Sequence, residues 1–266
     1  MQHPAVDGAT RLYGIIGDPI AQVKSPAVFN EKFRGLGKNA VLVPLHVRPE
    51  RFDESLRGLK SLANLDGMLV TIPFKSRVLA HVDLVLPAAR RIGAVNALRR
   101  DADGRWSGEM FDGAGCLLGM RASGLDPKGR SIMLLGAGGA GSAVADALAE
   151  AGAASIAIFD LVESKSTALA EKVGRSHPGC RVLARPPTLA GIDVLVNATP
   201  VGMAPGDGLP MELASLDAAL FVADIVPHPE VTPLLALARR SGCRTMQGKA
   251  MVVGQSDAIL RFFGLL

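Results

Sequence analysis

Apolar runs alternate with helix-like patterns along the first 71 residues. The apolar runs predict strands at residues 12–17, 40–46 and 67–71. The segments between them predict helices over residues 25–36 and 49–62. Ser25 is expected to cap the first helix, with Pro26 in its first turn. This β-α-β-α-β order predicts a largely parallel sheet.

The alternation becomes more regular after residue 130. Strands are predicted at residues 132–135, 155–160, 180–184, 193–197 and 220–224. Helices are predicted at residues 163–175, 231–241 and 252–263, in addition to one that follows the first of these strands. Between the two halves, a helix is expected from Asp112 to about residue 123, and a turn at 126–129 marks a domain seam. We therefore predict an α/β protein of two domains: an N-terminal mixed α/β domain and a Rossmann-type doubly wound parallel sheet.

Composition and charge exclude several classes of protein. The net charge is +4 with the two signs interspersed, and the chain has one Trp and one Tyr, so we expect no nucleic-acid partner. The longest uncharged run has fifteen residues (131–145), too few to span a bilayer. Residues 1–14 lack the apolar core of a signal peptide. The three cysteines lack C-x-x-C spacing, so we expect no metal site and a cytoplasmic protein with reduced thiols.

A glycine-rich segment follows the apolar run at 132–135 and opens an Ala-rich helix. Its G-x-G-x-x-G pattern consists of Gly136, Gly138, Gly139, Ala140 and Gly141. In this context the glycines permit a tight turn, close approach of a pyrophosphate and close helix–strand packing. The helix N-terminus then offers free N–H groups to the anion. The alternative is a glycine-rich turn that binds no ligand.

Asp160 ends the next predicted strand, 24 positions after Gly136. An acid at this place can accept hydrogen bonds from the ribose hydroxyls of the adenosine. It would repel the 2′-phosphate of NADP by roughly 4 kcal/mol at about 4 Å, and no Arg follows at 161 or 162. We therefore expect NAD to be favoured over NADP. The alternative is an Asp that only caps the following helix.

Several further segments together resemble one family. In chain order they are GDPIAQVKSPAVFN, GMLVTIPFK, GAVNAL, FDGAG, LLGAGGAGSA, VNATPVGM, DIVPHPEVTPLL and GKAMVVGQ. They are similar to the shikimate dehydrogenase family, including its quinate/shikimate branch, over nearly the whole chain. The resemblance implies an NAD(P)-dependent oxidoreductase of aromatic amino acid biosynthesis. It implies a substrate domain of residues 1–112 plus 248–266, an NAD(P) domain of residues 113–247 and a site in the cleft.

The resemblance also implies roles for individual residues. Lys75 matches the catalytic lysine and Asp112 its paired carboxylate. The substrate ligands match Ser25, Thr71, Asn96 and Gln255, and the nicotinamide side matches Asn197, Thr199, Met203 and Gly248. Oxidation of a secondary alcohol needs a group that accepts the hydroxyl proton, which a lysine amine can do. The implied partner is a small cyclic hydroxy acid, and the protein is expected to be a monomer or a homodimer without membrane partners.

The sequence departs from the family pattern around the expected site. Val23 replaces the first serine of Ser-x-Ser-Pro, which would hold the substrate carboxylate. Other departures are Gln22 for His, Leu69 for Asn, Met110-Phe111 for Asn-Thr, His228 for Tyr and Ala250 for Gly. They predict either a paralogue acting on quinate or a less polar cyclic hydroxy acid, or a weak shikimate enzyme. The rival functions are a non-catalytic dinucleotide and ligand sensor and an unrelated Rossmann enzyme.

Overall fold

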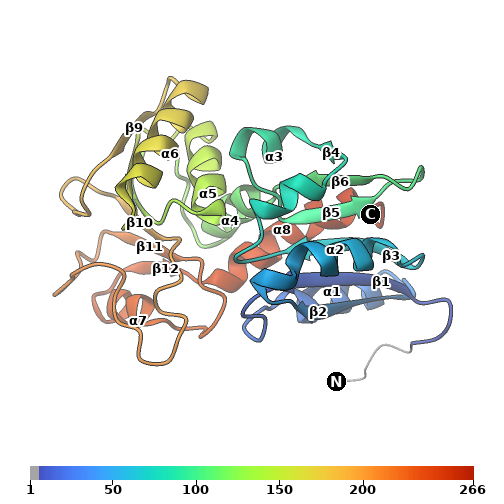
Figure 1. The fold of residues 1–266 in the computed structure, drawn as a ribbon. Helices are drawn as coiled ribbons and strands as arrows, with labels where there is room; N and C mark the ends of the chain where they lie inside the picture. The colour runs from blue at the N-terminus through green and yellow to red at the C-terminus, as the bar shows by residue number, and fades with distance from the viewer. Residues whose placement is uncertain (1–5) are drawn as a thin grey trace. The chain divides into compact units, whose positions relative to one another are not determined.

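The computed structural model describes residues 6–266, so the start of the segment tested for a signal peptide lies outside it. The chain divides into two compact units, each with its own six-stranded sheet (Figure 1). Unit 1 contains the residues up to 111 and residues 256–266, and unit 2 contains residues 112–255.

Unit 1 is built on a mixed sheet. Its strands are β1 (Arg11–Gly17), β2 (Ala40–His46), β3 (Leu65–Val70), β4 (Leu84–Val85), β5 (Ala97–Arg100) and β6 (Trp106–Glu109). Its helical segments are α1 (Ser25–Gly35), η1 (Pro49–Arg51), α2 (Phe52–Lys60), η2 (Arg77–His81) and α3 (Pro87–Ile92). The sheet order is β2-β1-β3-β5-β6-β4. The predicted parallel pairing is confirmed for β1 with β2 and β3, but β5 is antiparallel to both of its neighbours.

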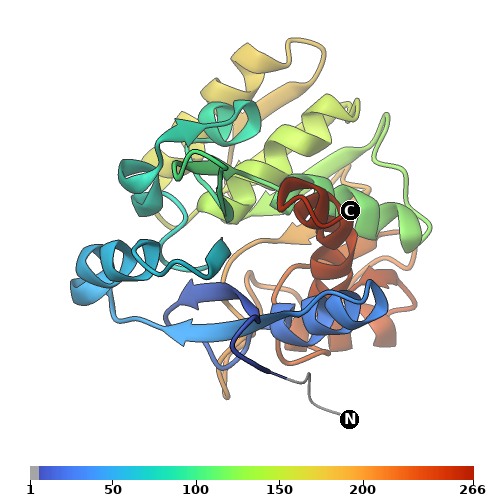
Figure 2. The same ribbon diagram turned by 90° about the vertical axis from the view of Figure 1, so that its right-hand side faces the viewer.

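The core of unit 1 explains why the apolar runs form the central strands. Tyr13 and Ile15 of β1 face the same side as Leu69 of β3, and Phe29 and Phe33 of α1 pack on them. Four residues near the C-terminus complete this cluster: Ile259, Leu260, Phe262 and Phe263. Figure 2 shows α1 and α2 on either side of the strands of this unit. Burial of this aromatic and aliphatic surface is the main force that fixes the strand register.

Unit 2 has the predicted Rossmann topology. Its strands are β7 (Ser131–Leu135), β8 (Ser155–Phe159), β9 (Arg181–Ala184), β10 (Val194–Asn197), β11 (Phe221–Asp224) and β12 (Arg244–Met246). Its helices are α4 (Asp112–Ala122), α5 (Gly139–Glu150), α6 (Glu163–Ser176), α7 (Pro233–Arg240) and the first part of α8 (Gly248–Phe262). The strands are all parallel in the order β12-β11-β10-β7-β8-β9, which is the doubly wound dinucleotide-binding order.

Both faces of this sheet are covered, as a fully buried parallel sheet requires. One apolar cluster joins Ile132, Ile156 and Val196 to residues of α5 and α6. The opposite cluster joins Met133 and Leu195 to residues of α7. Figure 1 shows α5 and α6 on one side of the strands and α7 on the other. The carboxyl ends of β7, β8 and β10 therefore share one edge of unit 2.

Glycine contacts between helices hold α4 and the start of α8 in unit 2. A Cβ on Gly113 would collide with the carbonyl oxygen of Ala143 in α5. A Cβ on Gly115 would lie 2.6 Å from the carbonyl oxygen of Met251 in α8. By these contacts Asp112 and residues 248–255 group with unit 2.

Three further observations concern residues 6–266. None of the helices described there is long and apolar enough to cross a membrane. Within the same residues, no group of three His, Cys, Asp or Glu side chains could hold a metal ion. Cys116, Cys180 and Cys243 are free and buried.

Candidate functional site

The glycine-rich turn joins β7 to α5 at the carboxyl edge of the unit 2 sheet. Gly136 has a φ of 98°, and a Cβ there would lie 2.8 Å from the carbonyl oxygen of Ala198. A Cβ on Gly141 would collide with the carbonyl oxygen of Gly136. Gly138 differs, since it is exposed and a Cβ there would meet no atom within 4 Å. Gly136 and Gly141 therefore serve the packing of the turn, and Gly138 leaves an open approach to the N-terminus of α5, as a bound phosphate needs.

Asp160 follows β8 and supports this turn from the neighbouring strand. Its Oδ2 accepts a hydrogen bond from the Ala137 N–H at 2.8 Å, and its Oδ1 accepts one from the Val162 N–H at 2.9 Å. A carboxylate oxygen has two lone pairs, so each atom keeps capacity for a ribose hydroxyl. The next residue, Leu161, is 92% exposed. The end of β8 thus combines one fixed acid with an uncharged aliphatic surface.

A buried polar network lies at the ends of β10 and β11. The Asn197 side chain is fully buried; its Oδ1 accepts hydrogen bonds from the hydroxyl of Thr199 at 2.7 Å and from the Thr199 N–H at 3.1 Å. Its Nδ2 donates to the Val201 carbonyl oxygen and to Oδ1 of Asp224, both at 3.1 Å. Asn197 therefore shapes the segment that carries Thr199, and its amide is already committed to that task.

Asp224 anchors this network, although the sequence pattern does not single it out. Its Oδ2 accepts a hydrogen bond from the Thr232 hydroxyl at 2.6 Å, and its Oδ1 accepts one from the Val226 N–H at 3.1 Å. Burial raises the pKa of Asp224 to about 6, although the hydrogen bonds to the carboxylate act in the opposite direction. Thr232 in turn caps α7 by accepting from the Leu235 N–H at 3.2 Å. The signal available in the sequence was an acid at the end of an apolar run.

The loop after β10 carries Met203, which the resemblance placed beside the nicotinamide. The Met203 N–H donates to the Pro200 carbonyl oxygen at 3.1 Å, which closes a turn. Asp207 holds this turn, since one of its oxygens accepts from the N–H groups of Gly202 and Ala204, each at 2.9 Å. These backbone hydrogen bonds lower the pKa of Asp207 below its usual value. Met203 thus lies on a loop whose conformation is held by the Asp207 carboxylate.

Helices α4 and α8 carry the remaining predicted residues of unit 2. Asp112 is the first residue of α4 and only 2% exposed, where the helix N-terminus favours a carboxylate. Gln255 of α8 lies beside this helix, because a Cβ on Gly115 would be 2.8 Å from the Gln255 Cβ. Gly248 begins α8, and a Cβ there would collide with the Val226 carbonyl oxygen after β11.

Burial raises the pKa of the Cys116 thiol to about 12, which excludes that cysteine as a nucleophile.

Three predicted residues of unit 1 lie at one edge of its sheet. The Thr71 N–H donates to the Ile16 carbonyl oxygen at 3.0 Å, and the carbonyl oxygen of Asn96 accepts from Val70 at 2.8 Å. The carbonyl oxygen of Lys75 accepts from Val95, the neighbour of Asn96, at 2.8 Å. These backbone bonds bring Thr71, Lys75 and Asn96 onto adjacent segments. The Asn96 Oδ1 accepts from the Phe111 N–H at 2.8 Å, which fixes the orientation of its amide.

Ser25 was expected to be the N-cap of α1, and this expectation is wrong by one residue. Lys24 is the N-cap and makes no side-chain hydrogen bond to the helix, whereas Ser25 is the first helical residue. Since Pro26 occupies the next position, the first turn has fewer N–H groups that need a cap. The Ser25 hydroxyl is therefore not used as a cap.

Two residues that depart from the family pattern pack on the same apolar cluster of unit 1. Val23 and Phe111 both lie against the cluster that includes Tyr13, Ile15 and Leu69. Phe111 also contacts Phe262, with ring centroids 5.5 Å apart. Gln22 donates from its amide to the Pro19 carbonyl oxygen at 2.7 Å. Val23 and Phe111 are thus partly buried apolar side chains that pack against the core of unit 1.

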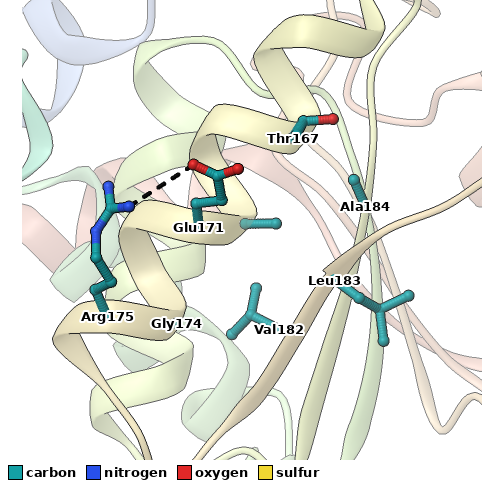
Figure 3. A pocket seen from close by; sticks show the side chains of 8 residues that line it. Thr167, Glu171, Gly174, Arg175, Val182, Leu183 and Ala184 are labelled. Carbon is teal, nitrogen blue, oxygen red and sulfur yellow. Dashed lines mark ion pairs between the residues drawn. The ribbon is translucent and has the colours of Figure 1, made fainter.

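A groove between α6 and β9 contains none of the predicted residues. Its lining consists of Thr167, Ala170, Glu171, Gly174, Arg175, Val182, Leu183 and Ala184 (Figure 3). Glu171 and Arg175 form an ion pair of 3.7 Å on its rim. The dinucleotide residues instead gather at the carboxyl ends of β7, β8 and β10. The strand order, the glycine turn and the acid after β8 define a dinucleotide-binding protein of the Rossmann type.

Comparisons with known proteins agree with this class and narrow it. The family model described as "Shikimate dehydrogenase substrate binding domain" matches residues 15–98. A curated shikimate dehydrogenase (NADP(+)) of Rubrobacter xylanophilus is 40% identical over 96% of this chain and 91% of its own length. The chain belongs to the shikimate dehydrogenase family.

Solved structures similar to this chain include enzymes that are named for different substrates. A quinate dehydrogenase from Corynebacterium glutamicum in complex with NAD has a TM-score of 0.83 at 30% identity, over 97% of this chain and 94% of that chain. A ligand-free 5-ketofructose reductase of Gluconobacter sp. strain CHM43 has a TM-score of 0.82 at 30% identity, over 96% and 92%. Both similarities extend over nearly the whole chain.

Proposed function

We propose that this protein catalyses reversible hydride transfer between a nicotinamide dinucleotide and a ring hydroxyl or ketone of shikimate, quinate or a related cyclic hydroxy acid. The family and the nearly full coverage of its relatives carry this proposal. The dinucleotide supplies the hydride acceptor when bound, and the open position at Gly138 beside the α5 N-terminus fits its pyrophosphate.

We assign the proton transfer to Lys75 and the orientation of the reacting groups to Asp112. When bound, the nicotinamide would accept the hydride from the substrate carbon that bears the hydroxyl. The hydroxyl proton passes to Nζ of Lys75 as the C–O bond becomes C=O. Asp112, buried as the first residue of α4, can hold both an ammonium and a hydroxyl. Reduction of the ketone reverses each step.

We assign substrate binding to Ser25, Thr71, Asn96 and Gln255. The backbone bonds that align Thr71, Lys75 and Asn96 support three groups acting on one ligand. Gln255 is supported by its buried position on α8 next to α4. Asn197, Thr199, Met203 and Gly248 are assigned to the nicotinamide side. For Asn197 we propose an indirect role, because its amide is engaged by Thr199, Val201 and Asp224.

We propose that shikimate is not the best substrate. Val23 packs on the apolar cluster of unit 1, and by the family resemblance it replaces a serine that holds the substrate carboxylate; Phe111, on the same cluster, replaces a small hydroxyl side chain with a bulky ring. A hydrogen bond to a charged group contributes about 1.5–3 kcal/mol, so the loss of one lowers the affinity for a substrate carboxylate by roughly 10- to 150-fold. A related cyclic hydroxy acid whose binding depends less on this clamp fits these residues better.

We propose that NAD is favoured over NADP. Asp160 places a negative charge at the end of β8, and the adjacent Leu161 side chain is exposed and uncharged. The curated relative named above is NADP(+)-dependent by name, so the preference rests on these residues of this chain.

The proposal includes a cytoplasmic location, since three buried free thiols suit a reducing compartment. It also includes a monomeric or homodimeric state, which light scattering measures. A sensor without catalysis was the alternative, and no observation favours it over the enzyme.

The test is a panel of initial rates at 340 nm. Shikimate, quinate and related hydroxy acids are each offered with NAD⁺ and NADP⁺, and 5-ketofructose is offered with NADH and NADPH. We expect reduction of the dinucleotide by at least one cyclic hydroxy acid, with a higher kcat/KM for one of the related hydroxy acids than for shikimate. If no member of the panel reacts while NADH binds, the protein is a binding module and the proposal fails.

A further inference from the structure

The end of strand β9 lies beside the end of β8, where Asp160 follows. Ile158 of β8 is paired with Ala184 of β9, and the Arg185 N–H continues the ladder to the Ile158 carbonyl oxygen at 3.1 Å. Arg185 therefore stands opposite Phe159, one residue before Asp160. Strands lie about 4.8 Å apart and rise about 3.3 Å per residue, which puts the Cα atoms of Arg185 and Asp160 roughly 6 Å apart.

The alternation of side chains places Arg185 on a particular face of the sheet. Val182 and Ala184 pack on the cluster that includes α6. Phe159, opposite Arg185, packs on the other cluster. Arg185 therefore projects on the side away from α6 and from the groove of Figure 3. Because Arg185 directly follows the last residue of β9, it also lies at the carboxyl edge of the sheet, where ligands of doubly wound sheets bind.

The Arg185 side chain has no partner among residues 6–266. Its Nε is buried and makes no hydrogen bond within the described part of the chain. No ion pair is formed there with Asp160 or with another acid. Buried donors in proteins are nearly always satisfied, so an unpaired guanidinium Nε points to a ligand that supplies the acceptor.

We propose that Arg185 binds the 2′-phosphate of NADP and gives this protein a usable affinity for NADP in spite of Asp160. This inference rests on the proposed function, since it concerns the same dinucleotide site. A guanidinium offers several donors in a fixed fork that matches phosphate oxygens. Its charge opposes the repulsion from Asp160, so the cofactor choice depends on two residues from neighbouring strands.

Arg181 provides a matched control on the same strand. It lies at the opposite, amino end of β9 and is exposed. Arg185→Ala and Arg181→Ala remove the same charge from the chain. A general electrostatic effect would therefore be shared by both variants, whereas a contact with the 2′-phosphate would be lost only in Arg185→Ala.

The experiment measures dissociation constants of NADPH and NADH by fluorescence titration of the full chain. We expect Arg185→Ala to raise the dissociation constant of NADPH by roughly 10- to 100-fold and to leave that of NADH within about twofold of wild type. Arg181→Ala is expected to change neither. Arg185→Lys, which keeps the charge but loses the fork, is expected to fall between wild type and Arg185→Ala for NADPH.

Two results would overturn the inference. One is an unchanged NADPH affinity in Arg185→Ala, and the other is an equal loss for NADPH and NADH. Unchanged NADH binding shows at the same time that the variant is folded. Failure of the wild-type protein to bind either dinucleotide would instead refute the proposed function itself.

Discussion

The Asn197 Nδ2 donates a hydrogen bond to Oδ1 of Asp224 at 3.1 Å, and both side chains are fully buried. This bond joins the ends of β10 and β11. Because the Oδ1 of Asn197 also holds Thr199, the conformation of the segment assigned to the nicotinamide side depends on the carboxylate of Asp224.

The burial of Asp224 leads to a prediction about how the stability of the fold depends on pH. Its pKa is raised from 3.8 to about 6 by burial, so the folded protein holds this proton more tightly than the unfolded chain. The stabilising contribution of protonated Asp224 to the free energy of unfolding is therefore fully present below pH 4 and is lost as the pH rises through 6. Over this range we expect the free energy of unfolding of wild type to fall by on the order of 3 kcal/mol relative to that of Asp224→Asn.

Urea unfolding at several pH values measures this difference. Asp217→Asn, which changes an exposed carboxylate of the same unit, is the control and should show no such trend. A stability difference between wild type and Asp224→Asn that is constant from pH 4 to 7 would refute the role given to burial.

The glycine turn predicts opposite results for two similar variants. Gly138→Ala adds a methyl group that meets no atom of the protein within 4 Å, so we expect unchanged thermal stability. It would, however, obstruct the approach of the pyrophosphate, and we expect NADH to bind at least tenfold more weakly. Gly141→Ala forces a collision with the Gly136 carbonyl oxygen and should lower Tm by several degrees.

Calorimetry and fluorescence titration of the two variants separate these effects. Equal losses of stability in both would mean that Gly138 serves packing only. Normal NADH binding by a folded Gly138→Ala protein would place the pyrophosphate elsewhere.

Val23→Ser tests the missing clamp hydroxyl. If a serine at this position holds the substrate carboxylate, we expect the KM for shikimate to fall by about tenfold, with little change in kcat. Val28→Ser is the matched control, since Val28 packs on the same apolar cluster. If KM does not move, or moves equally in both variants, the loss of the hydroxyl does not explain the substrate preference.

Much of unit 2 could be predicted from sequence because its strands are continuous apolar runs separated by helices. The glycine turn after β7 and the acid after β8 were found for the same reason. Unit 1 was harder. Strands β4, β5 and β6 have two to four residues, and β5 ends in two arginines, so no period was visible. Their pairing depends on contacts that are remote in sequence.

The residues missed at the site share one cause. Asp224 and Thr232 acquire their roles, and Arg185 its proposed one, only when neighbouring strands bring their ends together. Positions 161 and 162, next to Asp160 in the sequence, carry no basic residue, whereas the sheet brings position 185 beside this strand end. The structure likewise explains the FDGAG segment, whose glycines allow α4 to approach α5 and α8.

The most direct test of the central claim compares wild type with Lys75→Ala in the oxidation of shikimate and quinate, followed at 340 nm from pH 6 to 10. A lysine accepts a proton only as the neutral amine, so we expect the wild-type rate to rise toward alkaline pH. We expect Lys75→Ala to lose about a thousandfold in kcat while binding NADH normally, and the exposed-site control Lys38→Ala to match wild type. A wild-type rate that is flat over this range with hydride transfer rate-limiting, or a Lys75→Ala protein with undiminished kcat, would contradict the account.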